Sequence, residues 1–455
     1  MPTAPDNEKI IYLTAGAGGM FCGSCMHDNA LSRALSDHGW DIQLVPTYTP
    51  IRTDEKDFSV DRVMFGGVNV YLQQKIPLLR YLPAFLDRFL DSPWLIRKVT
   101  SKAMETDAKM LGKLAHSMLL GEQGNQRKEV RQLCKWLMAI NPKLVIFSNI
   151  LIGGCIESLK QKSNVPVLVT LQGDDVFLDS LKEPYKTKCI QRIKEITQHV
   201  DGFIVQSNFF RDYMSEYFSI PLSKFYVTPL GIDVSDFQNQ RRTHQPRQPE
   251  QLHTIGYLAR LAHEKGLHHL VNAFIQLKSR PNTQHIQLKI AGWLGPEHRA
   301  YAQQQFDRLN EAGLKDDFEY LGAIERDAKL EFLKSIDLFS VPTQFEEPKG
   351  LYVLEALAAG VPVVVHEHGA FPELVSESTG GVLVPHEAPE LLADAILRLL
   401  SDHELRNKMG QAGQRYVFEQ RNSKTMAEVT SQAIEEFFQK HFRASGEEST
   451  TDGRG

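Results

Sequence analysis

The chain has 455 residues and a formal net charge of -5, with 42% hydrophobic and 24% charged residues. It is longer than a single hydrophobic core usually serves, so about two or three domains are expected. The composition is that of a globular protein, and the slight acidic excess argues against nucleic acid as a partner.

The amino-terminal segment and the cysteines favour a cytoplasmic protein. Residues 1–13 lack the apolar run of a secretory signal, and no later stretch is long enough to span a bilayer. The five cysteines are an odd and sparse set, which argues against a disulfide framework. The sequence leaves open a peripheral contact with the inner face of a membrane.

Short β-branched runs alternate with helical segments in the first part of the chain. Residues 9–16 predict a buried strand that ends in glycine, and residues 29–39 predict a helix with a glycine at its end. Further strands are expected within 40–46, 143–149, 165–171 and 202–208. Continuous apolar strands separated by helices are typical of a parallel sheet covered on both faces.

The glycine loop Gly16–Gly19 follows the first predicted strand. Its small residues would let a ligand approach the backbone, although a plain strand-to-helix turn explains them equally well. A dinucleotide fingerprint would need a third glycine where Phe21 stands, and the lysine of a phosphate loop is missing. Cys22 and Cys25 have a metal or redox spacing, but no second such pair exists, so we interpret them as a structural or incidental pair.

Residues 75–138 interrupt the alternation of strands and helices. This segment is helical in pattern and amphipathic, and its first part is basic. We interpret it as an insert that packs its leucine and phenylalanine face on the first sheet. The alternative is a surface that binds an acceptor or touches a membrane.

Polar residues close the strand predicted at 165–171. Gln172 and Gly173 are followed by two carboxylates, Asp174 and Asp175, which could bind a metal ion. Adjacent side chains of an extended chain point in opposite directions, so the two carboxylates would rarely serve one ion. We interpret the segment as a turn or cleft wall in which Gln172 points toward a ligand.

A polar stretch at 236–252 without apolar periodicity is interpreted as a linker between two α/β halves, 1–235 and 253–422. Strands are expected again within 253–260, 287–293, 318–322, 337–343 and 361–367. The final residues, 444–455, are polar and are expected to be disordered.

The first strand of the second half is followed by a basic loop with Arg260, Lys265 and Gly266. A guanidinium and an ammonium on one loop can bind the two phosphates of a diphosphate, and ligands of open α/β sheets gather at the carboxyl ends of strands. The alternative is two solvated charges.

A second polar loop, residues 343–350, precedes a short helix that is expected to run from Gly350 to Gly360. The free amides at its start suit a phosphate. Glu347 lies in the loop and Glu355 lies within the helix, where its apolar neighbours predict burial. A buried carboxylate needs partners, and carboxylates bind vicinal hydroxyls well.

In combination, these segments resemble the retaining glycosyltransferases of family 4, formerly group 1, which have the GT-B fold. The order Arg260, Lys265, Glu347, Glu355 carries the resemblance, and the match is closest over 253–385. It implies two Rossmann-like parallel-sheet domains that face each other across a cleft. It also implies a last helix, within 423–443, that crosses back onto the first domain.

The resemblance further implies transfer of a sugar from a UDP- or GDP-sugar, with retention and without a cofactor or metal, to an unknown acceptor. Arg260 and Lys265 would bind the diphosphate, Glu347 the donor sugar and Glu355 the ribose. The other implied donor-binding residues are Gly18, Gly19, Gly292, Gly322, Ile324, Lys349, Gly350 and Leu351. The acceptor-side candidates are Gln172, Asp174 and Asn208.

The chain departs from the family pattern at three positions. Gln172 stands where the family often has histidine, Lys349 stands where an aromatic residue is usual, and Leu230 stands where asparagine is frequent. Rival interpretations with the same fold are a sugar epimerase, a phosphorylase and a catalytically silent nucleotide-sugar-binding protein. A dehydrogenase is disfavoured by the composition of the first glycine loop.

Overall fold

The computed structural model describes residues 9–16, 23–60, 63–64, 108–238, 252–386 and 388–451, with only the backbone described at 108–110 and 442–451. Most of the predicted insert at 75–138 therefore lies outside the described residues, as does most of the predicted linker. The chain divides into two compact units. Unit 1 comprises Met1–Pro229 and Met426–Gly455, and unit 2 comprises Leu230–Thr425.

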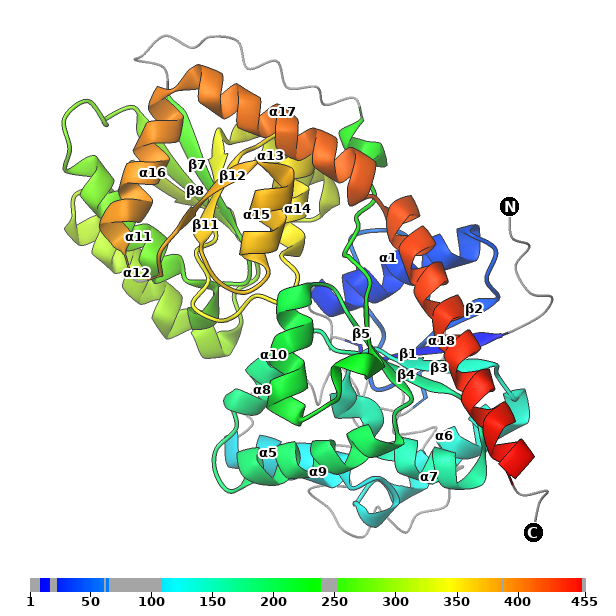
Figure 1. Ribbon diagram of the computed structural model, residues 1–455. Coiled ribbons are helices and arrows are strands. Elements are labelled where there is room, and N and C mark those ends of the chain that lie inside the picture. Colours follow the sequence, from blue (N-terminus) through cyan, green and yellow to red (C-terminus); the bar gives the residue numbers. More distant parts are fainter. Residues whose placement is uncertain are drawn as a thin grey trace. The chain divides into compact units, whose positions relative to one another are not determined.

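Unit 1 is built on a six-stranded parallel sheet with the strand order β2-β1-β3-β4-β5-β6 (Figure 1). The strands are β1 (Ile10–Thr14), β2 (Ile42–Pro46), β3 (Leu144–Phe147), β4 (Val167–Thr170), β5 (Gly202–Val205) and β6 (Phe225–Val227). The strands of this sheet pair in parallel, as the sequence predicts. Both faces of β1 are buried, which is why its sequence is apolar without alternation.

Helices connect and cover these strands. They are α1 (Gly23–Asp37), α5 (Ala108–Leu119), α6 (Arg127–Ile140), α7 (Ile156–Lys162), α8 (Asp174–Asp179), α9 (Tyr185–Ile196) and α10 (Asn208–Phe218). The described part of the predicted insert contains α5 and most of α6 and is helical. Local capping sets helix ends: the Ser207 side chain accepts a hydrogen bond from the amide of Phe210 at the start of α10.

The last helix, α18 (Ser423–Thr451), packs on unit 1. Met426, Ile434 and Phe437 share a buried cluster with residues of α1, and Figure 1 shows both helices on the same side of the sheet. The indole of Trp40 donates a hydrogen bond of 2.9 Å to the hydroxyl of Ser431. The helix continues to Thr451, into the stretch predicted to be disordered, because helix propagation adds a backbone hydrogen bond for each residue.

Unit 2 has its own six-stranded parallel sheet, with the order β12-β11-β10-β7-β8-β9. The strands are β7 (His253–Leu258), β8 (Ile286–Ala291), β9 (Phe318–Tyr320), β10 (Leu338–Phe339), β11 (Val363–His366) and β12 (Gly381–Val384). The helices are α11 (Leu267–Lys278), α12 (Arg299–Glu311), α13 (Arg326–Ser335), α14 (Leu351–Ala358), α15 (Phe371–Ser378), α16 (Pro389–Ser401) and α17 (His403–Gln420).

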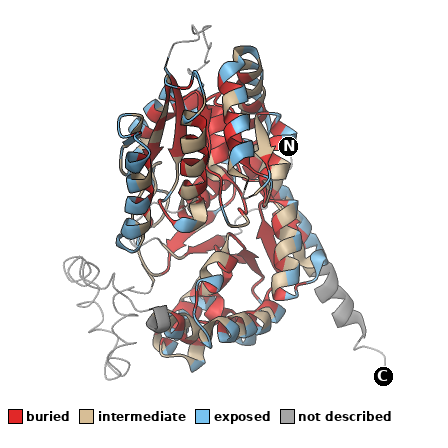
Figure 2. Cartoon of the chain, turned by 90° about the vertical axis from the view of Figure 1, so that its left-hand side faces the viewer, coloured by how far each residue is buried: buried red, intermediate tan, exposed pale blue. Residues whose placement is uncertain are grey.

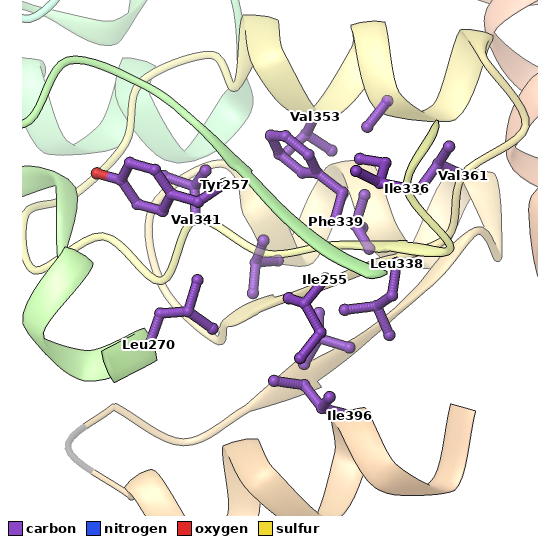
Figure 3. Packing of buried hydrophobic residues seen from close by; sticks show 14 of the residues in the cluster. Ile255, Tyr257, Leu270, Ile336, Leu338, Phe339, Val341, Val353, Val361 and Ile396 are labelled. Atoms are coloured by element: carbon purple, nitrogen blue, oxygen red, sulfur yellow. The ribbon is translucent and has the colours of Figure 1, made fainter. Parts of the chain in front are cut away.

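The core of unit 2 surrounds its central strands. Figure 3 shows Ile255 and Tyr257 of β7 beside Leu338 and Phe339 of β10, between side chains from helices on the two faces. Figure 2 shows most strand residues as buried, whereas many exposed residues lie on the helices. The edge strands β9 and β12 are less buried than the central strands. The predicted α/β architecture of two Rossmann-like halves is confirmed.

The chain enters unit 2 earlier than the predicted linker at 236–252 suggests. Leu230, Ile232 and Phe237 are buried in the core of unit 2. Asp236 forms an ion pair of 2.8 Å with Arg326. The segment therefore belongs to unit 2 despite its polar sequence, because single apolar residues suffice to anchor an irregular strand exit.

We predict that Phe437→Ala destabilises unit 1. The ring is 2% exposed and stacks edge-on against Tyr226 at 6.1 Å between centroids. Loss of a buried phenylalanine costs about 3–5 kcal/mol because it removes apolar contacts and leaves a cavity. Thermal and denaturant unfolding would measure the change. The control is Glu436→Ala on the same helix, which removes an exposed ion pair with Lys440 and should change stability by less than about 0.5 kcal/mol.

Candidate functional site

The basic loop and the polar loop of unit 2 leave adjacent strands at the same edge of the sheet. Arg260 and Lys265 follow β7, and Glu347 follows β10, the strand that pairs with β7. The carboxyl ends of neighbouring parallel strands lie side by side, so the fold brings together residues that are far apart in the chain.

The two loops approach each other closely. Gly266 has a φ of 71°, and a Cβ added there would lie 1.7 Å from the carbonyl oxygen of Pro342. The amide of Gln344 donates a hydrogen bond of 2.9 Å to the carbonyl of Glu264. Only glycine fits at position 266, both for its left-handed conformation and for this contact.

Lys265 and Glu347 form an ion pair across these loops. The ammonium Nζ lies 2.8 Å from the carboxylate Oε2. The same oxygen accepts a 2.7 Å hydrogen bond from the hydroxyl of Tyr352, and Oε1 accepts one of 3.2 Å from the amide of Gly350. Glu347 is only 4% exposed, so these donors replace water around its charge.

The environment of Glu347 keeps its carboxylate ionised. Burial, the largest single influence, acts to raise the pKa of Glu347. The charge of Lys265 and the hydrogen bonds from Lys265, Tyr352 and Gly350 outweigh burial, and the net pKa lies below the usual value. Burial and the neighbouring Glu347 raise the pKa of the Tyr352 phenol, so Tyr352 remains a hydrogen-bond donor.

Aromatic rings also contact the Lys265 ammonium. Its Nζ lies 4.5 Å from the ring centroid of Phe345 and 5.0 Å from that of Tyr352. A cation above an aromatic face is attracted by the ring electrons. The sequence analysis did not select either ring, although both flank Glu347 in the chain.

The loop of Glu347 is held from its other side by the turn after β11. The amide of Ala370 donates to the carbonyl of Glu347 at 2.7 Å, and the amide of Gly369 donates to Oε2 of Glu346 at 2.7 Å. A Cβ at Gly369 would lie 2.5 Å from the Glu347 amide nitrogen. The candidate carboxylate is therefore fixed by contacts from three loops.

Arg260 lies on the same strand end but is directed toward Glu264. Its Nη2 is 2.5 Å from Oε1 of that residue, and its side chain is 42% exposed. This ion pair links residues four apart in the chain. A diphosphate would have to compete with the Glu264 carboxylate for the guanidinium.

Glu355 is also paired with a lysine. Its Oε1 lies 2.5 Å from Nζ of Lys329 on α13, and the two residues are 7% and 6% exposed. The sequence analysis did not select Lys329. The spacing could have revealed it: Lys329, Phe332 and Leu333 are the buried residues of α13, at i, i+3 and i+4.

The other predicted donor-binding residues of unit 2 lie at the start of α14 and at or after the ends of β8 and β9. Gly350, with a φ of 68°, caps α14 and is followed directly by Leu351, while Lys349 is buried. The amide of Gly292 donates to the carbonyl of Gly322 at 2.8 Å at the ends of β8 and β9. Ile324 is half-buried and packs against the unit 2 core. Gly18, Gly19 and Cys22 lie outside the described residues.

The acceptor-side candidates lie in unit 1. The side-chain nitrogen Nε2 of Gln172 donates to Oδ1 of Asp28 at 2.9 Å and to the carbonyl of Ser148 at 2.8 Å. Asp28 lies on α1, is fully buried, and also accepts hydrogen bonds from Tyr12 and Thr14. The sequence analysis did not select Asp28, although Tyr12 and Thr14 are two residues apart on β1 and so share one face.

Asp174 and Asn208 are engaged locally. The two oxygens of Asp174 accept hydrogen bonds from the backbone amides of Ile150 and Gln172, both at 2.9 Å. These contacts give the Asp174 carboxylate a structural role in joining two loops. Asn208 is exposed, and its side-chain oxygen accepts a hydrogen bond from Arg211.

Asp175 has a different environment from its neighbour Asp174. Burial, followed by the Asp174 charge, raises the pKa of Asp175 to about 7. Within the described residues, no group of three or more histidine, cysteine, aspartate or glutamate side chains is arranged to hold a metal ion. Over the same part of the chain, no helix has the length and apolar character needed to cross a membrane.

Several histidines cluster behind the Glu347 loop. The rings of His269, His366 and His386 lie 4.9–5.3 Å apart between centroids, and the ring of His268 lies 4.0 Å from that of His269, tilted by 38°. A ring nitrogen of His366 and one of His368 each lie within hydrogen-bonding distance of the carbonyl of Thr343, at 2.9 and 2.8 Å. Burial, with the neighbouring histidines as further causes, lowers the pKa of His268, His269 and His366 to about 4.

We predict that unit 2 loses stability as the pH falls from about 6.5 to about 4. An unfolded histidine has a pKa of about 6.5, so the unfolded chain binds more protons than the folded one in this window. The stabilisation is fully present above pH 6.5 and is lost as the pH falls toward the folded pKa values. Thermal unfolding midpoints measured between pH 7 and pH 4 would show the decline.

The variant His269→Phe should flatten this pH dependence, since it removes one of the depressed groups from the cluster. The control variant His38→Asn alters an exposed histidine of unit 1 and should leave the slope as it is in the unaltered chain. Equal slopes for all three proteins would show that the cluster does not govern the acid response.

The chain was compared with family models and with proteins of known sequence. Residues 238–416 match the model of the glycosyl transferases group 1, and residues 118–236 match that of glycosyltransferase family 4. An uncharacterised glycosyltransferase of Methanocaldococcus jannaschii is 28% identical over 50% of this chain and 58% of its own length. A D-inositol 3-phosphate glycosyltransferase of Corynebacterium efficiens is 29% identical over 41% of this chain and 45% of its own length.

A third relative is the GDP-mannose-dependent alpha-(1-6)-phosphatidylinositol monomannoside mannosyltransferase of Mycobacterium tuberculosis. It is 28% identical over 57% of this chain and 67% of its own length. The chain thus spans about half the length of the first curated relatives that it matches.

Solved structures share the fold over nearly the whole chain. Sucrose-phosphate synthase from Thermosynechococcus elongatus is 20% identical and has a TM-score of 0.68, with 95% of this chain and all of that chain covered. The Anabaena protein HepE in complex with UDP-glucose is 14% identical and has a TM-score of 0.64, with 94% of this chain and all of that chain covered. These likenesses confirm the GT-B fold.

Proposed function

We propose an activity for this chain on the basis of its family, since it belongs to the glycosyl transferases of group 1 and has the GT-B fold. In our proposal it transfers a sugar from a nucleotide-diphosphate-sugar to an acceptor with retention of configuration. The donor is a UDP- or GDP-sugar. The names of the mycobacterial relative and of the HepE complex support these two donor classes without choosing between them.

The ion pair between Lys265 and Glu347 carries this proposal. A donor presents a dianionic diphosphate next to a hexose with several hydroxyls. An ammonium and an ionised carboxylate 2.8 Å apart offer one partner for each part of that molecule. Lys265 would contact the diphosphate, while Glu347 would accept hydrogen bonds from sugar hydroxyls.

Arg260 and the start of α14 complete the proposed diphosphate site. Arg260 would leave Glu264 and bind a phosphate oxygen with its planar guanidinium. The amides of Lys349, Gly350 and Leu351 would face the distal phosphate at the start of α14. These groups supply the positive charge that a metal ion supplies elsewhere, so we propose a metal-independent reaction.

The proposed transfer takes place on one face of the sugar. The bond between the anomeric carbon and the diphosphate oxygen breaks, and a bond from that carbon to the acceptor oxygen forms. The leaving diphosphate takes the proton of the acceptor hydroxyl. Lys265 stabilises the charge that develops on the diphosphate, and Glu347 holds the sugar in place.

We also propose which residue of unit 1 borders the acceptor and in which compartment the protein is found. Gln172 would border the acceptor side from unit 1, and its side chain is already positioned by Asp28 and Ser148. We propose a cytoplasmic location, in which the buried thiols of Cys134, Cys155 and Cys189 remain reduced.

We predict that Lys265→Ala lowers turnover by about 10²–10³-fold, because it removes the charge that stabilises the leaving diphosphate. Affinity for the donor should fall much less. Release of nucleotide diphosphate from UDP- and GDP-sugars, with and without candidate acceptors, would measure turnover. The control Lys334→Ala alters an exposed lysine of α13 and should retain full activity.

Two outcomes would contradict the proposal. An unchanged turnover for Lys265→Ala would remove Lys265 from the reaction. Tight binding of a nucleotide-sugar by the unaltered protein with no release of diphosphate, over a broad panel of acceptors, would indicate a binding protein instead of an enzyme.

A further inference from the structure

The buried ion pair between Lys329 and Glu355 lies about one turn inside α14, beyond the Glu347 loop that precedes the helix. The two residues come from different helices, and their charged atoms are 2.5 Å apart. Around Glu355, the helix α14 buries only apolar side chains, namely Val353, Leu354, Ala356, Leu357 and Ala358. The pair therefore places two charged side chains among the otherwise apolar side chains that α14 buries.

Stability alone does not account for such a pair. Two charges lose their hydration on burial, and their mutual attraction roughly repays that loss, so apolar residues of similar volume usually stabilise a fold at least as well. Removing one partner is costly, however, because the other charge is left buried. The pairing of Lys329 with Glu355 is thus explained if the carboxylate has a role in binding a ligand, because Lys329 then stabilises a group that the protein must keep.

The geometry fixes how Glu355 can be used. One carboxylate oxygen, Oε1, receives the Lys329 ammonium. A carboxylate accepts hydrogen bonds at both oxygens, about four in all, so capacity remains for a pair of vicinal hydroxyls. The ammonium also restricts the side chain to one orientation, which reduces the entropy lost when a ligand binds.

We infer that Lys329 is a positioning residue that orients the Glu355 carboxylate to bind the ribose hydroxyls of the nucleotide. This inference rests on the proposed function, in which Glu355 holds the ribose. Lys329 contacts the carboxylate and not the ligand. Its loss should therefore weaken recognition of the ribose while contacts to the diphosphate remain.

The test compares nucleotides with and without the two ribose hydroxyls. Calorimetric titration would give dissociation constants of UDP and GDP and of their 2′,3′-dideoxy counterparts. For the unaltered protein, the dideoxy form of the preferred nucleotide should bind more weakly. Lys329→Met should reduce this discrimination about tenfold or more, with little change in dideoxy binding, because the Glu355 carboxylate loses the hydrogen-bond partner that holds it in place.

Two further variants separate charge from structure. Lys329→Arg keeps a cation and should preserve most of the discrimination. Lys334→Met, on the exposed side of the same helix, removes the surface pair with Glu331 and should leave the discrimination unchanged. If Lys329→Met fails to fold, Lys329→Gln retains a polar side chain without the charge and should show the same loss of discrimination.

The outcomes distinguish this inference from the proposed function. Unchanged discrimination in Lys329→Met, or in Lys329→Gln if that variant replaces it, would overturn the inference. Equal weakening of ribose and dideoxy forms would also overturn it, because a purely structural role predicts that result. If the unaltered protein binds neither UDP nor GDP, the proposed function fails, and the inference falls with it.

Discussion

Burial of opposite charges between loops that are distant in sequence organises unit 2. The Glu347 carboxylate is nearly inaccessible to water, and it is tolerated there because Lys265, Tyr352 and the Gly350 amide surround it with donors. Each donor depends on the fold: Lys265 on the pairing of β7 with β10, and the other two on the start of α14. The site is therefore a consequence of strand order as much as of residue type.

The same principle recurs at Glu355, where Lys329 of α13 supplies the compensating charge. Glu347 thus precedes α14 and Glu355 lies within it, and each of the two carboxylates is paired with a lysine from another segment. Apolar side chains pack α14 into the core of unit 2, while the paired charges provide the groups that would bind a ligand in our proposal. A nucleotide-sugar, which carries phosphates between two groups of hydroxyls, is suited to such an alternation of cations and carboxylates.

In unit 1, the buried carboxylate of Asp28 is stabilised by hydrogen bonds from uncharged groups. Asp28 accepts hydrogen bonds from the hydroxyls of Tyr12 and Thr14 and from the side-chain amide of Gln172, and the ring of His27 lies 3.6 Å from it. Gln172 stands where related enzymes often have histidine. Its side-chain amide donates hydrogen bonds to Asp28 and to the Ser148 carbonyl, so Gln172 is a fixed, buried element of unit 1 rather than a group that exchanges protons.

Local pattern was sufficient for the architecture. Apolar runs at 9–16, 143–149 and 253–260 contain β1, β3 and β7, and Gly350 marks the start of α14, because strand burial and glycine conformation are encoded by neighbouring residues. The order Arg260, Lys265, Glu347, Glu355 likewise indicated the family. The partners of the charged and polar side chains could not be predicted from the sequence in this way. These contacts depend on which strands and helices become neighbours in the fold. They include the ion pairs Lys265–Glu347 and Lys329–Glu355, the turn of Arg260 toward Glu264, and the hydrogen bonds of Asp174 to two backbone amides. An ion pair or hydrogen bond forms only when its two groups lie within a few ångströms of each other. For groups tens of residues apart in the chain, that distance is set by how their segments pack in the folded protein.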